Sequence, residues 1–405
     1  MKPKLVITVN TESNKVLLRN KQSHPITSLF FIGLWLLACA SQSLIYADSW
    51  HCEIKTLEQI MENDDQIKYI PCYPARPFIY KELPLADNHY LHPYSGLFKE
   101  TFILTIPNGQ VTGCDGWIIV QDSIINELIW QNVYLHKDAL QQAKKNAPLI
   151  KEGRVAVIAQ TGNLYYYHWM VEVLGRLALL EMQGIEYDYL YVPLITPFMK
   201  ETLELWGINP SKIIVASDDT MVIANELIVP SLVSHVAVHG LPRLVHYIPD
   251  YLVHYIRTKL LLAVEQQKHT HQFNKKVFIS RQDAASRKII NEDEVFALFE
   301  AQGFTRYHLT KLSILEQIVL FKNAETIVGS IGSGLTNILF CHPKVKIIEL
   351  YQARRDSTIW NLSQMIGLRN HHCIKTTEFI EQREGQFDTE IPLEVIHEVI
   401  AQLLI

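Results

Sequence analysis

A histidine, a glutamate and an arginine lie at helical spacing in the first half of the chain. The first two can transfer a proton, and the arginine can bind an anion. His168, Glu172 and Arg176 are separated by four residues each. In an α-helix this spacing places them on one face over two turns. A base, an acid and a fixed cation together suit proton transfer beside an anionic leaving group. The same spacing is equally typical of a salt-bridged helix face, where each pair contributes roughly a few tenths of a kcal/mol.

A glycine-rich turn in the second half has the composition of an anion site. The apolar run 324–328 predicts a buried strand, and residues 338–340 could open a helix. The turn between them, residues 329–337, is rich in small and polar residues, among them Gly332, Ser333, Gly334, Thr336 and Asn337. Glycines let the backbone approach a ligand, and free N–H groups at a helix start favour phosphate. Asn337 replaces the third glycine of Gly-x-Gly-x-x-Gly, so the dinucleotide fingerprint is not met, and a plain tight turn is the alternative.

Two arginines follow another predicted strand, residues 276–280. Arg281 and Arg287 lie in a polar loop that ends at Asn291 and Glu292. Asparagine at a helix cap followed by acidic residues predicts a helix start there. Guanidinium groups bind phosphate through two parallel hydrogen bonds, so two arginines facing the glycine turn could clamp a diphosphate. A solvated basic loop is the alternative interpretation.

These segments are positioned by alternating predicted strands and helices. Apolar runs predict strands at 155–159, 189–192, 212–215, 226–229, 276–280, 324–328 and 345–350, and a hairpin at 116–125. Periodic runs predict helices at 164–183, 197–206, 244–267, 292–302 and 313–321. Such alternation predicts an α/β fold with parallel sheets in two units and a boundary near 240–275. The proline-rich residues 50–110 predict irregular structure that wraps the first unit.

Composition excludes several classes of protein. Of 405 residues, 48% are hydrophobic and 20% charged, which excludes wholesale disorder. The net charge of −5 gives no basic excess, so nucleic acid is not a predicted partner. The six cysteines form no Cys-x-x-Cys pair, and residues 371–373 (His-His-Cys) lack ligand spacing and are expected in loops, so no metal site is predicted. Cys52 and Cys72 either pair in an oxidising compartment or are free thiols.

The N-terminal segment predicts membrane targeting. Residues 29–40 are solidly apolar and a weaker run continues to residue 47, after a lysine- and arginine-bearing stretch. This pattern fits a cleaved signal peptide or a single uncleaved anchor at residues 1–48, with the membrane contacted through residues 29–47. Membrane association is therefore expected, while the side of the membrane stays open. A buried core element is the alternative.

The three site segments occur along the chain in the order 163–177, 279–294 and 329–337, and together they resemble glycosyltransferase family 61. That family contains plant xylan arabinosyl- and xylosyltransferases and animal protein O-GlcNAc transferases. The resemblance implies two Rossmann-like α/β domains in a GT-B-like arrangement. It assigns residues 49–240 to an N-terminal acceptor-side domain, residues 241–275 to a linker helix, and residues 276–405 to a C-terminal donor-binding domain.

The resemblance also implies the chemistry: inverting transfer from a nucleotide sugar, expected to be a UDP-sugar, to a hydroxyl of a glycan or protein, with no required cofactor. It implies three catalytic residues: His168, Glu172 and Arg176. It implies donor-site residues at Arg281, Arg287, Asn291, Glu292, Gly332, Ser333, Gly334, Thr336 and Asn337. Ile331 stands where many members have histidine, and Gly175 where many have proline. A nucleotide-sugar-binding accessory protein without activity, and a sugar hydrolase, are the alternatives.

Overall fold

The computed structural model of the protein describes residues 8–10, 15–17, 53–80, 94–129, 148–234, 248–351, 358–376 and 388–404. The chain forms two units, Met1–Cys52 and Glu53–Ile405. The first unit contains an antiparallel hairpin of β1 (Thr8–Asn10) and β2 (Lys15–Leu17). The predicted membrane segment at residues 29–47 lies outside the described residues. Within the described ranges, no helix combines the length and the apolar character needed to cross a bilayer.

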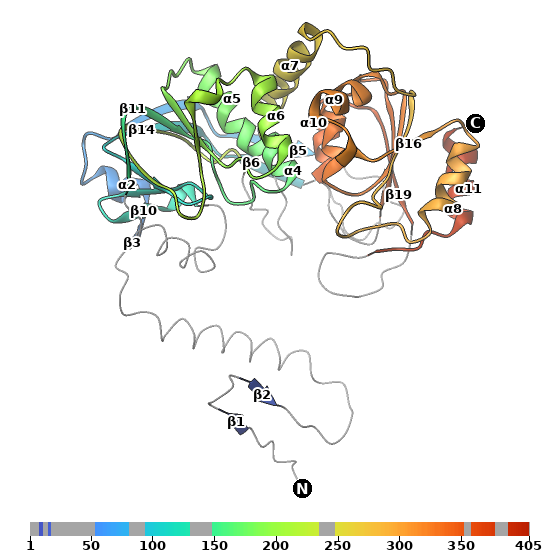
Figure 1. The fold of residues 1–405 in the computed structure, drawn as a ribbon, viewed down its shortest axis with the longest axis horizontal. Helices are drawn as coiled ribbons and strands as arrows, with labels where there is room; N and C mark the ends of the chain where they lie inside the picture. The colour runs from blue at the N-terminus through green and yellow to red at the C-terminus, as the bar shows by residue number, and fades with distance from the viewer. Residues whose placement is uncertain are drawn as a thin grey trace. The chain divides into compact units, whose positions relative to one another are not determined.

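The larger sheet of the second unit contains ten strands with a parallel part at one end (Figure 1). The parallel strands lie in the order β13 (Ile213–Val215), β12 (Tyr189–Val192), β11 (Leu149–Val157) and β14 (Met221–Pro230). Numbered along the chain, this is the order 3-2-1-4, which reverses direction between β11 and β14. In open α/β sheets, ligands bind beyond the carboxyl ends of the strands at such a reversal.

Six further strands complete the larger sheet, and three of them overturn a prediction. β3 (Glu53–Lys55), β4 (Lys68–Tyr73) and β7 (Thr101–Pro107) occupy residues expected to be irregular. β4 contains Pro71, but it pairs with β7 along one edge, so the missing proline N–H interrupts no second ladder among the described strands. The others are β8 (Gln110–Thr112), β9 (Trp117–Val120) and β10 (Ser123–Ile125), and β9 and β10 form the predicted hairpin. β5 (Arg76–Tyr80) and β6 (Tyr94–Phe98) pair separately.

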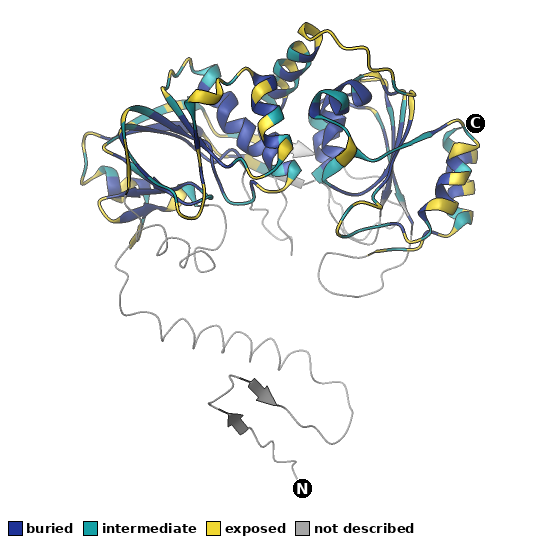
Figure 2. Cartoon of the chain, in the orientation of Figure 1, coloured by how far each residue is buried: buried dark blue, intermediate teal, exposed yellow. Residues whose placement is uncertain are grey.

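Helices cover one face of the larger sheet. They are α4 (Tyr166–His168), a π-helical turn (Trp169–Val173), α5 (Leu174–Met182), α6 (Pro197–Trp206) and α7 (Asp250–Gln266). α6 begins and ends where predicted, because proline is favourable in the first turn and Gly207 adopts the left-handed φ of 92° at its C-cap. The other face of the parallel strands packs on α2 (Leu57–Met61) and on β8 to β10 of the same sheet, whose buried side chains share one apolar cluster with β11, β12 and β14. Because both faces are covered, consecutive residues are buried along strands such as β7, β9 and β12 (Figure 2).

The smaller sheet has five parallel strands in the order β16 (Thr305–Tyr307), β15 (Lys276–Ile279), β17 (Thr326–Ser330), β18 (Lys346–Tyr351) and β19 (Asn370–Lys375). Along the chain this is 2-1-3-4-5, an order of doubly wound sheets. α9 (Ile314–Asn323) and α10 (Thr358–Met365) cover one face, while α8 (Glu292–Glu300) and α11 (Leu393–Leu403) cover the other (Figure 1). Consecutive residues obey this division, because Val277 and Ile279 pack toward α9 and Phe278 toward α8.

The predicted α/β class is confirmed. Both sheets contribute to one apolar core, which contains Ala156 beside the first set of helices and Ile279 beside α9. Ile256 of α7 and Ile318 of α9 belong to the same core, so these helices join the two sheets within one compact unit. The boundaries assigned to residues 49–240, 241–275 and 276–405 stay a prediction.

Candidate active site

His168 and Glu172 form a close pair at the start of the helix that follows β11. His168 Nδ1 lies 3.0 Å from Glu172 Oε1. The Glu172 side chain is 0% exposed, whereas that of His168 is 15% exposed. The second carboxylate oxygen, Oε2, accepts a 2.7 Å hydrogen bond from Gln160 Nε2. Glu172 therefore holds one imidazole nitrogen from behind, while the imidazole is the member of the pair that solvent reaches.

A π-helical turn shapes this pair. The helix is α-helical at Tyr166–His168, widens over Trp169–Val173 and returns to α-helix at Leu174. The turn carries Glu172 itself, and it brings Trp169 and Glu172 fully inside. Single π turns inside α-helices are frequent at functional sites. The sequence predicts an unbroken helix here, because a π turn has no signature in apolar periodicity.

Arg176 bonds to backbone carbonyls at the point where the larger sheet reverses direction. Its guanidinium donates to Ala159 O at 2.6 Å and to Pro230 O at 2.8 and 3.2 Å. Ala159 follows β11 and Pro230 ends β14, so carbonyl dipoles at two strand ends balance the buried charge. Burial lowers the pKa of Arg176 to about 9, which leaves it protonated at neutral pH. These bonds fix the backbone next to Gln160; the catalytic role of Arg176 stays a prediction.

The glycine turn at the end of β17 is in contact with Arg281. Gly332 has an extended backbone with φ 168°, and a 3₁₀-helix at Ser333–Phe340 begins directly after it. The expectation that a helix opens at residues 338–340 is therefore wrong, because the helix starts five residues earlier. A Cβ at position 332 would lie 1.8 Å from Arg281 Nη1 and 2.6 Å from its Cζ. Only glycine leaves room for the guanidinium against this backbone.

Arg281 is held by its own loop. Its Nε donates to Arg287 O at 3.0 Å, and its Nη2 donates to Ser286 O at 2.8 Å. Arg287 closes this loop with a left-handed φ of 60°, a strained conformation for a residue other than glycine. Burial, followed by the nearby charge of Arg287, lowers the pKa of Arg281 to about 10, so Arg281 remains charged at neutral pH. The loop thus presents positive charge at the amino end of the 3₁₀-helix, where anions are favoured.

Two buried hydroxyl groups flank the same turn. Ser330 ends β17 and Thr336 lies in the 3₁₀-helix; the residues are 3% and 1% exposed. Neither hydroxyl has a hydrogen-bond partner among the described residues. Buried polar groups are nearly always paired, so two unpaired hydroxyls at the end of β17 and in the following 3₁₀-helix are unusual. Gly334, in the same turn, packs against Leu309, since a Cβ there would lie 2.9 Å from Leu309 Cδ1.

Asn337 connects the glycine turn to the helix of His168. Its Oδ1 accepts a 2.7 Å bond from Tyr166 Oη, two residues before His168. Its Nδ2 donates to Gln317 Oε1 at 2.9 Å and to Gly334 O at 3.2 Å. Asn337 is 0% exposed, so these bonds occupy a side chain predicted to contact the donor. This bridge brings two of the three predicted segments together.

Asn291 and Glu292 follow the loop that contains Arg281 and Arg287, and their side chains bond to backbone groups on either side of it. Asn291 occupies the predicted N-cap position of α8 but makes no capping bond. Its amide instead exchanges two hydrogen bonds with the backbone of Ile391, at 2.8 and 2.9 Å. The buried Glu292 accepts a 3.0 Å bond from the Arg281 backbone N–H and another from Ser280 Oγ. Both residues position the loop, and their contact with a donor stays a prediction.

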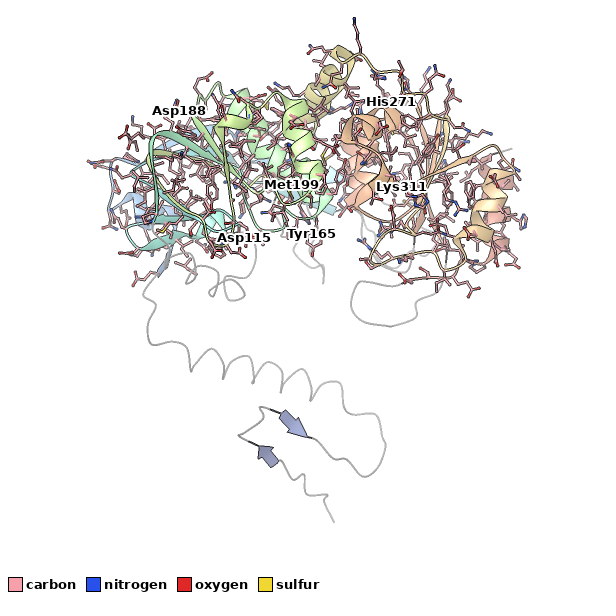
Figure 3. All side chains as sticks on the ribbon, in the orientation of Figure 1. Asp115, Tyr165, Asp188, Met199, His271 and Lys311 are labelled. Carbon is pink, nitrogen blue, oxygen red and sulfur yellow. The ribbon has the colours of Figure 1, made fainter. Side chains whose placement is uncertain are left out.

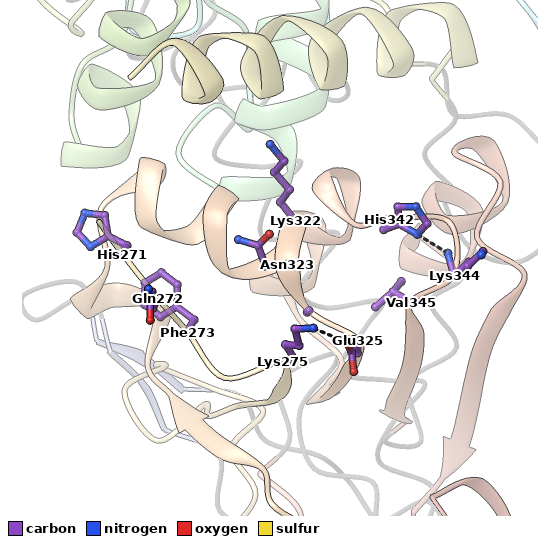
Figure 4. Close-up of a pocket in the computed structure, with 11 residues that line it drawn as sticks. His271, Gln272, Phe273, Lys275, Lys322, Asn323, Glu325, His342, Lys344 and Val345 are labelled. Atoms are coloured by element: carbon purple, nitrogen blue, oxygen red, sulfur yellow. Dashed lines mark hydrogen bonds and ion pairs between the residues drawn. The ribbon is translucent and has the colours of Figure 1, made fainter. Parts of the chain in front are cut away.

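A cavity of about 620 Å³ lies elsewhere (Figure 4). Its lining comes from the segments that precede β15, β17 and β18, so it lies at the amino edge of the smaller sheet, opposite the glycine turn. Figure 3 labels one of its lining residues, His271. Lys275 pairs with Glu325 at 2.7 Å, and Lys322 pairs with Glu265 at 2.7 Å. The paired cations of this cavity do not converge on a shared point.

Part of the chain matches a model of a known protein family. Residues 166–348 match the family model Glycosyltransferase 61. The resemblance seen in the sequence is confirmed. Every predicted catalytic and donor-site residue falls inside the glycosyltransferase 61 region. Gln160, which orients Glu172, lies just outside it; its place directly after a buried strand is the sequence signal that could have identified it.

Two curated relatives are named as N-acetylglucosamine transferases. The chain is 30% identical over 86 residues to the EGF domain-specific O-linked N-acetylglucosamine transferase of Drosophila melanogaster, covering 20% of this chain and 16% of the relative. It is 28% identical over 119 residues to the Mus musculus protein of that name, covering 28% and 23%. The chain thus spans less than a quarter of the length of these relatives. The glycosyltransferase 61 region and these relatives support a glycosyltransferase activity.

Proposed function

We propose that the protein is an inverting glycosyltransferase that moves a sugar from a UDP-sugar to a hydroxyl of a glycan or protein. One observation carries this proposal. The His168–Glu172 pair and the glycine turn with Arg281 come from different sheets, yet the Tyr166–Asn337 bond joins them at 2.7 Å. A base for an acceptor hydroxyl thus lies on the same side of the molecule as a site for an anionic leaving group.

His168 acts as the base in this proposal. Glu172 is 0% exposed and both of its oxygens face protein groups, so no acceptor hydroxyl reaches it. His168 is partly exposed, so an acceptor hydroxyl can reach its imidazole. It takes the proton of the acceptor hydroxyl as the oxygen attacks the anomeric carbon, and the carboxylate behind it stabilises the imidazolium that forms. Glu172 is then a positioning residue.

The donor diphosphate binds at the glycine turn. Arg281, Arg287 and the backbone N–H groups at Ser333 and Gly334 stabilise the charge that grows on the leaving UDP, so the reaction requires no metal cofactor. In this account the two sheets correspond to two Rossmann-like domains of a GT-B-like enzyme, with residues 276–405 on the donor side and residues 49–240 on the acceptor side.

UDP-N-acetylglucosamine is the first donor to test, because the relatives carry N-acetylglucosamine transfer in their names. The acceptor is proposed only by class, as a hydroxyl of a glycan or protein. Membrane association through residues 29–47, by a cleaved signal or a single anchor within residues 1–48, remains part of the proposal.

Thermal unfolding of the full chain with and without UDP tests the donor site. A ligand at 100 times its dissociation constant adds about 2.7 kcal/mol to the native state, which gives a measurable rise in Tm. Arg281→Ala should abolish the rise. Lys275→Ala is the matched control, since it removes a paired cation at the opposite edge of the same sheet. An equal rise in the wild type and in Arg281→Ala would rule out this donor site.

A nucleotide-sugar-binding protein without transferase activity is the second candidate. Ile331 favours it, because this apolar residue is 2% exposed and stands beside Gly332, where many family members have histidine. Under this reading UDP raises Tm in the same Arg281-dependent way, but no UDP-sugar is consumed.

A further inference from the structure

Three side chains with metal-binding atoms converge between β18 and β19, in the interior of the smaller sheet. They are Glu349, His371 and Cys373, and each is at least 90% buried. His371 and Cys373 are two residues apart on β19 and therefore face the same side of the sheet. Glu349 pairs directly with Cys373 in the parallel register of β18 and β19. The expectation that residues 371–373 lie in loops is wrong, and strand pairing supplies the ligand spacing that the sequence lacks.

The distances between these atoms fit a single small cation. Glu349 Oε2 lies 3.0 Å from His371 Nε2 and 3.5 Å from Cys373 Sγ, and Sγ lies 3.7 Å from Nε2. Tetrahedral Zn²⁺, with bonds of about 2.0–2.2 Å to oxygen or nitrogen and 2.3 Å to sulfur, requires separations of about 3.3–3.6 Å between its ligands. The observed triangle therefore lies within a few tenths of an ångström of a zinc ligand set.

A chain of hydrogen bonds through Ser363 places the proton of the neutral His371 ring on Nδ1, the nitrogen that faces away from Glu349. Ser363 Oγ lies 2.7 Å from Trp360 O, which can only accept, so the single hydroxyl proton points there. His371 Nδ1, 2.9 Å from the same Oγ, must then be the donor of that second bond. In the neutral ring, Nε2 consequently carries a lone pair directed at a carboxylate 3.0 Å away. Two facing acceptors require a proton or a cation between them, and a hydrogen-bonded Nδ1–H is the usual support of a metal-bound histidine.

The fourth ligand atom is available on Glu349. Its Oε1 is buried and has no hydrogen-bond partner among the described residues. A carboxylate that binds through both oxygens, one imidazole and one thiolate make four ligand atoms in a distorted tetrahedron, because the two oxygens of one carboxylate lie closer together than two separate ligands. Their charges of −1, 0 and −1 balance a divalent cation, so the buried centre is neutral. A neutral, fully coordinated ion avoids the large cost of an isolated buried charge.

We propose that Glu349, His371 and Cys373 bind one Zn²⁺ in a structural site that fastens β19 to β18 and, through Ser363, to α10. The ligands are closed from solvent, as in structural rather than catalytic zinc sites. The site lies just beyond the matched region, which ends at residue 348. It would exist whether or not the chain transfers a sugar, so its test is independent of glycosyl transfer.

Metal content of the full chain, purified without chelators, is the direct test. We expect about one zinc per chain in the wild type and near zero in Cys373→Ser. Cys341→Ser is the matched control, because Cys341 is a buried free thiol outside the cluster. His372→Asn is a second control, since His372 lies between the two ligands on the strand but faces the other way. Both controls should retain the wild-type zinc content.

Cobalt substitution keeps the test decisive if Cys373→Ser fails to fold. Co²⁺ bound to a thiolate gives a charge-transfer band, which is assigned to Cys373 by comparing the wild type with variants in which each of the other cysteines, Cys341 among them, is replaced by serine. A band in all of these proteins, together with a fall in Tm when the metal is removed by a chelator, is the expected result. Metal well below one equivalent in the wild type with no cobalt band would overturn the proposal and leave a metal-free histidine–glutamate pair with a hydrogen-bonded thiol.

Discussion

Replacing Gly332 by alanine isolates the contact that defines the donor site. The new Cβ would lie 1.8 Å from Arg281 Nη1, while ordinary contact begins at 3.4 Å. The guanidinium must therefore shift by the difference, about 1.6 Å. All three of the nearest atoms, Nη1, Cζ and Nε, belong to Arg281, so no other side chain shares the strain.

The magnitude follows from what holds Arg281 in place. A shift of about 1.6 Å breaks its 3.0 Å bond to Arg287 O and its 2.8 Å bond to Ser286 O. Hydrogen bonds from charged donors contribute about 1.5–3 kcal/mol each when buried, and less in a partly solvated loop. Overpacking alone costs about 1–3 kcal/mol. We therefore expect Gly332→Ala to lower the free energy of unfolding by about 2–3 kcal/mol and to remove UDP-dependent stabilisation.

Thermal unfolding of four proteins tests this reasoning: wild type, Gly332→Ala, Arg281→Ala and the double variant. If the clash with Arg281 is the cause, Gly332→Ala destabilises the wild type but costs little in the Arg281→Ala background. UDP should raise the Tm of the wild type only. Equal costs of Gly332→Ala in both backgrounds would refute the contact, and an unchanged Tm would show that the turn has room for a side chain.

Three further predictions concern Glu172 of the His168–Glu172 pair, Asn291 beside the arginine loop, and Glu316 at the start of α9. Glu172→Gln should lower turnover by about 10²–10³-fold with a small change in Tm, because the neutral amide fits between His168 and Gln160 but stabilises an imidazolium poorly; normal turnover would remove Glu172 from the mechanism. Asn291→Ala should lower unfolding free energy by about 1–3 kcal/mol, measured by denaturant titration, since two bonds to the C-terminal segment are lost. Backbone and hydroxyl bonds from Ser313 hold the pKa of Glu316 below its usual 4.5. The ionised Glu316 therefore stabilises the native state above pH 4.5, and this stabilisation disappears as the pH falls through the lower pKa of the folded state. Over that pH range, the Tm of Glu316→Gln should fall less steeply with decreasing pH than the Tm of the wild type.

Local pattern was sufficient for most elements that position the site. α6 and β12 occupy their predicted ranges, because proline, glycine and apolar alternation mark their ends and faces. The turns after β15 and β17 follow from the rule that parallel strands end at one edge of a sheet. The prediction of irregular structure at residues 50–110 is wrong, because proline does not exclude a strand that pairs along one edge only, as β4 does with β7.

Contacts between segments far apart in the chain could not be predicted from the sequence. The π turn at Trp169–Val173 preserves the apolar pattern of a regular helix, so nothing local marks it. The bridge from Tyr166 to Asn337 spans 171 residues and depends on how the sheets pack. The Glu349–His371–Cys373 cluster depends on the register between β18 and β19, which spacing along the chain does not encode. Sequence therefore identified residue types with the right chemistry, and tertiary structure decided which of them meet.

Consumption of UDP-sugars by the wild type and by His168→Ala tests the central claim most directly. Both proteins would be incubated with a panel of UDP-sugars, beginning with UDP-N-acetylglucosamine, and with peptide and glycan acceptors, while released UDP is measured. The account predicts release by the wild type, a loss of about 10²–10⁴-fold in His168→Ala, and equal stabilisation of both proteins by UDP. Equal release by the two proteins would contradict His168 as the base, and UDP binding without release from any donor would contradict the transferase itself.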